Sequence, residues 1–194
     1  MTPLFPLAQG LFPDSLLRLT IFEVRYLSMI KRCQKEQSPF GVVFLKEGSE
    51  VQKAGEVEQL FSWGCLAQIM SVTEIQPAVL AVTCQGQARF RLGEHQRGAL
   101  GLWQGQIDIQ PEDPAVPIPD HLQHLANRLG ELIATAQKKG LADHLPISPP
   151  YRLDECGWVA NRWADLIPLP ATEKVELLSE ADPEKRLLSL KDFF

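Results

Sequence analysis

Residues 3–26 read PLFPLAQGLFPDSLLRLTIFEVRY. The two Phe-Pro pairs in this stretch favour extended backbone, because the proline ring pushes the preceding residue out of the helical region. We expect these pairs to bracket an edge strand and a turn. Leu17, Leu19 and Ile21 then alternate with polar residues, which is typical of a strand. From Tyr26 onward the apolar spacing becomes helical, so the stretch predicts a strand that runs directly into a helix.

Further strands are predicted between this helix and the middle of the chain. Residues 79–84 are apolar throughout, which indicates a strand covered on both faces. Residues 103–109 alternate strictly between apolar or glycine and polar positions, so we expect one buried and one wet face. A polar stretch that contains Gly48 and Gly55 predicts a surface loop among these strands. Strands without long helices between them favour a closed or nearly closed barrel.

Residues 111–119 are rich in proline and divide the chain, because proline interrupts both helices and central strands. After this linker, Asp120 is expected to cap a helix, with Gln123 completing a capping box. Gly140 is expected to end that helix. Asp182-Pro183 predicts the start of a short last helix.

The fold class that follows is α+β. Residues 1–112 are predicted to form a mixed β pseudo-barrel with one helix, and residues 120–194 an α-helical bundle. In the bundle, Trp158 and Trp163 are five residues apart and do not share one helix face closely. We expect one of them to pack in the helical core and the other to be partly exposed.

The composition favours an acidic globular protein. The formal net charge of the 194 residues is −5, which argues against general binding to nucleic acid or to an anionic membrane. No apolar run approaches the roughly 20 residues that a membrane span needs. The N-terminus lacks the basic and apolar regions of a signal peptide, so we expect a cytoplasmic location.

Catalytic and metal motifs are absent from the sequence. It contains neither a G-x-x-x-x-G-K-[ST] phosphate loop nor a G-x-S-x-G nucleophile elbow. His121 and His124 share a helix face, but no third ligand is near them in sequence, so we expect no metal and no cofactor. The four widely spaced cysteines are expected to be reduced, buried thiols rather than a zinc site or disulfides.

Several motifs resemble, in the right order, those of the Lon protease N-terminal (substrate-binding) domain. Residues 3–26 are similar to the family's PLFPL, LFPG and IFE-x-RY motifs, and Phe40–Val43 to its FGVV strand. Residues 86–92 resemble its G-x-x-RFRI strand. The chain departs from the family where Asp14 stands in place of the usual glycine, a change that turns tolerate.

This resemblance implies a PUA-like barrel followed by a helical bundle. It also implies a non-catalytic module that binds unfolded or extended polypeptide. The ATPase and serine–lysine protease modules of full-length Lon enzymes would follow such a domain, and their motifs are not found in these residues. We therefore expect no enzymatic activity.

The conspicuous charged residues are Glu23, Arg25 and Arg89. Two interpretations remain open: an internal brace between the first helix and the barrel, or the polar floor of a peptide groove. Phe22 and Tyr26 are favoured as core residues over ligand-stacking ones. The candidate peptide-binding residues are Phe22, Glu23, Arg25, Tyr26, Arg89, Phe90 and Trp103.

Two other functions compete with polypeptide binding. The chain could be an adaptor or scaffold for one folded partner, such as a protease or chaperone. Alternatively, its PUA-like barrel could bind RNA, with local charge from Arg89, Arg91 and Arg97. The acidic net charge makes nucleic acid the less favoured partner.

Overall fold

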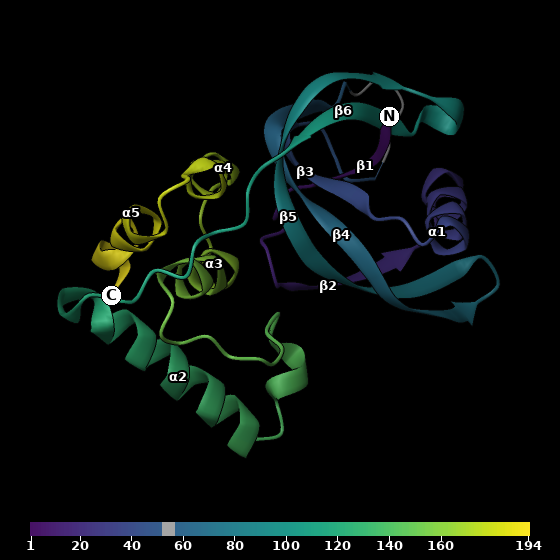
Figure 1. Ribbon diagram of the computed structural model, residues 1–194. Coiled ribbons are helices and arrows are strands. Elements are labelled where there is room, and N and C mark those ends of the chain that lie inside the picture. The colour runs from purple at the N-terminus through teal and green to yellow at the C-terminus, as the bar shows by residue number, and fades with distance from the viewer. Residues whose placement is uncertain (52–56) are drawn as a thin grey trace.

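The computed structural model describes residues 1–51 and 57–194 (Figure 1). Six strands and one helix form the N-terminal half, an extended linker crosses to the other side, and the remaining helices lie beside the barrel (Figure 1). This arrangement confirms the α+β prediction of a pseudo-barrel followed by a bundle. None of the helices among the described residues is both long and apolar enough to cross a bilayer.

The strands form one sheet that closes on itself. Its order is β2-β5-β4-β3-β1-β6, and an additional pairing between β5 and β6 closes five of the strands into a ring. The long strand β5 makes this possible, because it pairs with β2 along its first half and with β6 along its second half. The strands are β1 (Thr2–Leu7), β2 (Leu16–Ile21), β3 (Phe40–Glu47), β4 (Gln59–Gln76), β5 (Val79–Arg97) and β6 (Trp103–Ile109).

Strand β1 is not the edge strand that its prolines suggested. It pairs with β3 in parallel and with β6 antiparallel, and the two pairings overlap only at Leu4. Pro3 lies opposite β6 alone and Pro6 opposite β3 alone. Each proline therefore has one side without a partner strand, and a missing N–H can be tolerated there. The expectation of an edge strand was wrong for this reason.

The predicted passage from strand to helix is confirmed. Leu17 and Ile21 of β2 are buried, and helix α1 (Val24–Glu36) begins three residues after the strand ends. Residues Tyr26, Met29, Ile30 and Cys33 of α1 are buried and pack against the same core as β2.

The turn that follows β1 packs tightly on β5. Asp14 and Ser15 exchange backbone hydrogen bonds with Gly86, each 2.9 Å long. A Cβ atom on Gly86 would lie 2.0 Å from the carbonyl oxygen of Phe12, so only glycine fits there. Asp14 has a φ of 64°, a left-handed conformation that aspartate tolerates better than most residues. This explains why aspartate can replace the glycine usual in the family.

The helical half contains α2 (Gln123–Lys138), α3 (Cys156–Leu166), α4 (Ala171–Ser179) and α5 (Pro183–Leu188). The predicted cap at Asp182 is confirmed, since its carboxylate accepts from the N–H groups of Glu184 and Lys185. The predicted cap at Asp120 is wrong. Short 3-10 turns occupy Ala99–Gly101, Asp120–Leu122, Ala142–His144 and Lys191–Phe193.

Asp120 fails as a cap because it lies inside the 3-10 turn that precedes α2. Helix α2 begins after Leu122, which makes no side-chain cap. Gly140 does follow the helix closely, with a φ of 67°. Trp158 and Trp163 are both buried, so the expectation that one is partly exposed was also wrong.

The barrel and the bundle share a hydrophobic core. The core cluster of the helices includes Phe12 and Phe44 from the barrel side, and the rings of these two residues meet edge to face at 6.2 Å. The linker thus separates the two halves along the chain but not in packing. The polar loop predicted around Gly48 and Gly55 begins where β3 ends, since residues 48–51 belong to no helix or strand. Gly55 lies outside the described residues.

The four cysteines are free and buried, as predicted. Burial raises the pKa of the Cys84 thiol to about 12 and that of Cys156 to about 11. A raised pKa leaves very little reactive thiolate near neutral pH.

We expect iodoacetamide at pH 8 to alkylate the native protein at least about a hundredfold more slowly than the urea-unfolded chain. Mass spectrometry would follow the reaction, and rapid labelling of any native cysteine would contradict the core described here.

Candidate functional site

The structure places the seven candidate residues in three different environments. Arg25, Tyr26, Arg89 and Phe90 are buried, and Glu23 and Trp103 are half-buried. Phe22, expected in the core, is 51% exposed, because it lies beyond the last paired residue of β2. No single groove therefore contains them all.

Two of the candidates, Arg25 and Trp103, contact Glu58 just before β4, and Glu23 joins them through Arg25. The Arg25 guanidinium donates to Glu23 at 3.1 Å and to Glu58 at 3.4 Å. The Trp103 indole N–H donates to the other oxygen of Glu58 at 2.5 Å, and Arg97 lies 3.6 Å from that oxygen. This cluster ties α1, β4 and β6 together around a buried carboxylate.

The cluster favours the brace over the peptide groove for Glu23 and Arg25. Glu23 is the N-cap residue of α1 but makes no capping hydrogen bond with its side chain, which pairs with Arg25 instead. Sequence reasoning missed Glu58, because an isolated glutamate after a polar loop carries no signal that it will be buried. Glu58 is 33 positions from Arg25 in the sequence, and the two residues come into contact only when the barrel closes.

Tyr26 and Phe90 lie in two different hydrophobic clusters, Tyr26 between α1 and the sheet and Phe90 among strand residues alone. The Tyr26 ring lies 4.1 Å from that of Phe5, and the Arg25 guanidinium lies over it at 4.4 Å. Burial raises the pKa of the Tyr26 phenol well above its usual range. Phe90 is fully buried against Leu4 and Val43. These residues stabilise the barrel.

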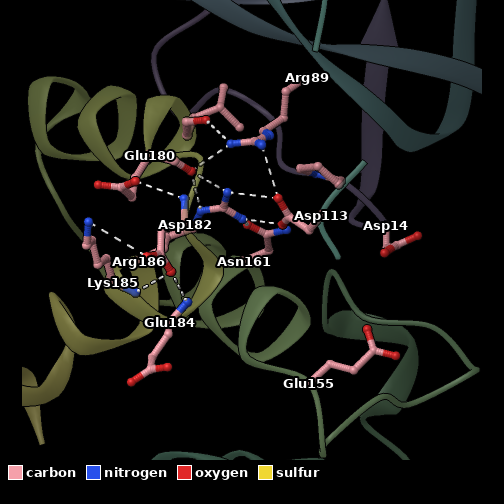
Figure 2. A network of polar contacts seen from close by, with 12 residues as sticks. Asp14, Arg89, Asp113, Glu155, Asn161, Glu180, Asp182, Glu184, Lys185 and Arg186 are labelled. Carbon is pink, nitrogen blue, oxygen red and sulfur yellow. Dashed lines mark hydrogen bonds and ion pairs between the residues drawn. The ribbon is translucent and has the colours of Figure 1, made fainter. Parts of the chain in front are cut away.

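Arg89 lies at the junction between barrel and bundle, in a group of residues that we call the junction network (Figure 2). It donates to the carbonyl oxygens of Leu178 at 2.9 Å and Glu180 at 2.8 Å, and its Nη2 lies 3.0 Å from Asp113. Burial, and then the neighbouring Arg186, lower the pKa of Arg89, while Asp113 opposes this shift. The junction network consists of Arg89, Asp113, Asn161, Glu180 and Arg186.

Arg186 holds the other side of the same carboxylate. Its two terminal nitrogens donate to the two oxygens of Asp113 at 2.5 and 3.0 Å, a bidentate pair. A further bond of 3.1 Å joins Arg186 to Asn161 on α3. Asp113 therefore receives one arginine from β5 and one from α5 (Figure 2).

A cavity of about 160 Å³ lies beside the junction network, lined among others by Asp14, Gln87, Arg152 and Trp158. It is smaller than the roughly 300 Å³ at which small-molecule pockets begin. Its charged side chains largely pair with one another: Arg152 contacts Asp14 and lies 3.3 Å from Glu155. The cavity offers no evident place for a substrate or cofactor.

Metal ligands do not converge in the described part of the chain. No group of three or more His, Cys, Asp or Glu residues is placed there to hold an ion. His121 and His124 are both exposed.

The open edge of β2 is the surface best suited to bind another chain. Among the described strands, β2 pairs only with β5. The Leu16 N–H points away from β5 and donates to Pro146 at 3.0 Å. Alternate residues of a strand direct their backbone groups to the same side, so Arg18 and Thr20 also point outward. We call the backbone of residues 18–20 the β2 edge.

Exposed apolar side chains lie at the far end of the β2 edge. Phe22 follows Ile21, which pairs with Leu80 close to the β4–β5 turn. Val24 at the start of α1 and Ile75 near that turn are exposed as well. The unpaired backbone groups of the β2 edge therefore lie next to exposed apolar side chains.

Comparison with known proteins identifies the family. The family model of the ATP-dependent protease La (LON) substrate-binding domain matches residues 1–193. The chain belongs to this family. The Lon substrate-binding domain is a non-catalytic module, in keeping with the residue environments described above.

Relatives and solved structures agree with this assignment. A Lon protease of Paraburkholderia phytofirmans is 29% identical over 189 residues, which cover 94% of this chain and 22% of that protease. This chain thus spans about a fifth of that relative's length. The crystal structure of a Lon N-terminal domain protein from Xanthomonas campestris has a TM-score of 0.77 at 26% identity, covering 100% of this chain and 98% of that one.

A second solved structure supports the fold alone. The N-terminal domain of the Lon protease of the Mycobacterium avium complex has a TM-score of 0.64 at 19% identity. The match covers 99% of this chain and 96% of that one.

The junction network predicts a large effect at Asp113. Replacing Asp113 with alanine leaves two buried arginines without their shared carboxylate, so we expect the free energy of unfolding to fall by about 3 kcal/mol or more. Urea denaturation would measure it. The control is Asp14→Asn, which removes the charge of a half-exposed ion pair and should cost less than about 1 kcal/mol. Equal costs for the two variants would show that the junction network does not stabilise the fold.

Proposed function

We propose that this chain is a polypeptide-recognition module that binds unfolded or extended protein segments by strand addition at the β2 edge. The observation that carries this proposal is the pair of outward-facing backbone positions, Arg18 and Thr20, beside the exposed ring of Phe22. In strand addition, main-chain hydrogen bonds supply affinity that depends little on sequence. Family membership in the substrate-binding domain supports the same reading.

A contact next to the β2 edge supports this proposal. The Pro146 carbonyl bonds to Leu16, and the Arg18 side chain donates to the Leu145 carbonyl at 3.3 Å. In the described part of the chain, no backbone hydrogen bond from outside the sheet is made to the β2 edge itself. The outward backbone groups of Arg18 and Thr20 are therefore available to a second chain.

The competing functions have less support from the geometry. For RNA binding, Arg89 is buried and Arg97 lies beside Glu58, so two of the three arginines expected to supply charge are engaged internally. For an adaptor of a folded protease or chaperone, the structure offers no feature that favours it over an extended chain. Both remain outcomes of the experiment.

The test is a proline at the β2 edge. Thr20→Pro removes an outward N–H and no β2–β5 hydrogen bond, so the fold should survive while strand addition fails. We expect the affinity of this variant for reduced, carboxymethylated lactalbumin to fall at least about fivefold. A loss of this size corresponds to the net free energy of one main-chain hydrogen bond. Thr20→Ala is the matched control and should bind as the unmodified chain does.

Fluorescence anisotropy would measure the affinities, and thermal melting would check the fold. Unchanged binding by Thr20→Pro would exclude the β2 edge as the site. If the unmodified chain fails to bind the unfolded protein but captures one folded partner, the adaptor function is correct instead. Salt-sensitive binding of an RNA oligonucleotide in place of polypeptide would favour the RNA function.

A further inference from the structure

A groove of about 230 Å³ lies between α4, α5 and the last turn of the described chain. These helices are the yellow pair at the left of Figure 1, in the half of the molecule that lacks the β2 edge. Leu169, Leu177, Leu190 and Phe193 form the apolar part of the groove. Leu177 and Leu190 belong to the buried core, while Phe193 is exposed at the rim.

The other lining residues make the groove strongly acidic. Glu173, Glu176 and Glu180 lie at positions i, i+3 and i+7 along α4 and just after it, which places them on one side of the helix. Among the residues that the structure describes, no lysine or arginine lines the groove. Its mouth therefore carries three carboxyl groups and no lining cation.

Two of these carboxylates are not used within the described residues. Glu180 accepts a hydrogen bond from the Asp182 N–H at 2.8 Å, so it is partly engaged in the local fold. The carboxylates of Glu173 and Glu176 are exposed and make no ion pair in the part of the chain that the structure describes. An occupant can pair with both without displacing an internal partner.

Size and chemistry together define the occupant. The groove is below the roughly 300 Å³ of a typical small-molecule pocket, so it suits one or two side chains better than a cofactor. An apolar floor with an acidic rim fits a side chain that has an apolar stem and a cationic head. Arginine and lysine bury their stems along apolar surface and keep their charges at the edge.

We infer that the α4–α5 groove is a second polypeptide-binding site, which takes an arginine or lysine that lies next to an apolar residue. The apolar neighbour packs on Phe193 and Leu177, and the cation pairs with Glu173 and Glu176. This site gives the module a preference for basic-apolar segments that strand addition at the β2 edge cannot supply, because main-chain hydrogen bonds do not distinguish side chains.

The experiment uses two fluorescent peptides that differ only in charge. One is Gly-Ser-Leu-Arg-Arg-Leu-Ser-Gly, and in the other both arginines are replaced by glutamine. We expect the unmodified chain to bind the arginine peptide about three- to tenfold more tightly, a preference that declines as salt is added. Equal affinity for the two peptides would overturn the inference.

Variants locate the site. Glu173→Gln with Glu176→Gln should abolish the preference for the arginine peptide while thermal melting stays unchanged. Glu47→Gln with Glu131→Gln removes the same charge from two exposed positions outside the groove and should keep the preference. A preference that survives the first pair, or is lost in the second, contradicts the groove.

Two further variants separate this inference from the proposed function. Phe193→Ser should weaken binding of both peptides, and unchanged binding would exclude the apolar part of the groove.

Thr20→Pro should leave the arginine peptide bound as before. If Thr20→Pro abolishes that binding, the peptide occupies the β2 edge and the groove is refuted while strand addition stands. If the arginine peptide binds but unfolded lactalbumin does not, the groove stands and strand addition fails.

Discussion

The carboxylate of Asp113 is the constraint on which the rest of the structure depends. It lies in the linker and receives Arg89 from the barrel and Arg186 from the bundle. Arg186 is fully buried, and Arg89 nearly so. Two buried guanidinium groups repel one another and lose their hydration, so they are tolerated only because one carboxylate and several carbonyl oxygens pair with both.

A third buried arginine strengthens the same junction from α3. Arg162 donates to the carbonyl oxygen of Pro13 at 2.5 Å and to the Ser15 hydroxyl at 2.6 Å, and lies 3.1 Å from Asp165. The turn after β1 is thereby held against the bundle. Paired charges and the shared core of Phe12 and Phe44 thus occupy most of the junction, and the cavity of about 160 Å³ beside them is smaller than a typical small-molecule pocket.

Local patterns in the sequence were enough to predict much of the fold. Alternation in residues 17–21 predicted β2, and the change of spacing at Tyr26 predicted α1. Asp182-Pro183 predicted the start of α5, because capping depends on residues close together in the chain. Local reasoning failed at Asp120, where a 3-10 turn takes the place of the first helical turn.

The site was harder to predict, because it depends on contacts between distant residues. Arg25 meets Glu58 only once the barrel has closed, and Arg89 meets Asp113 and the carbonyl of Glu180 only once the bundle packs against the barrel. The sequence analysis named both arginines as candidates, but it could not predict which residues they contact. It misjudged Phe22, since an aromatic residue at the end of a strand is buried or exposed according to where the pairing stops. It missed the α4–α5 groove, since the acidic spacing on α4 alone does not show that an apolar hollow lies beside it.

The central claim is that the shared carboxylate makes barrel and bundle one cooperative unit. Native-state hydrogen exchange across a series of urea concentrations tests it most directly. The account predicts that the slowest amides of β4 and β5 in the barrel and of α3 in the bundle converge on one free energy of unfolding and one urea dependence. Two separate free energies, with the bundle opening while the barrel stays protected, would contradict it.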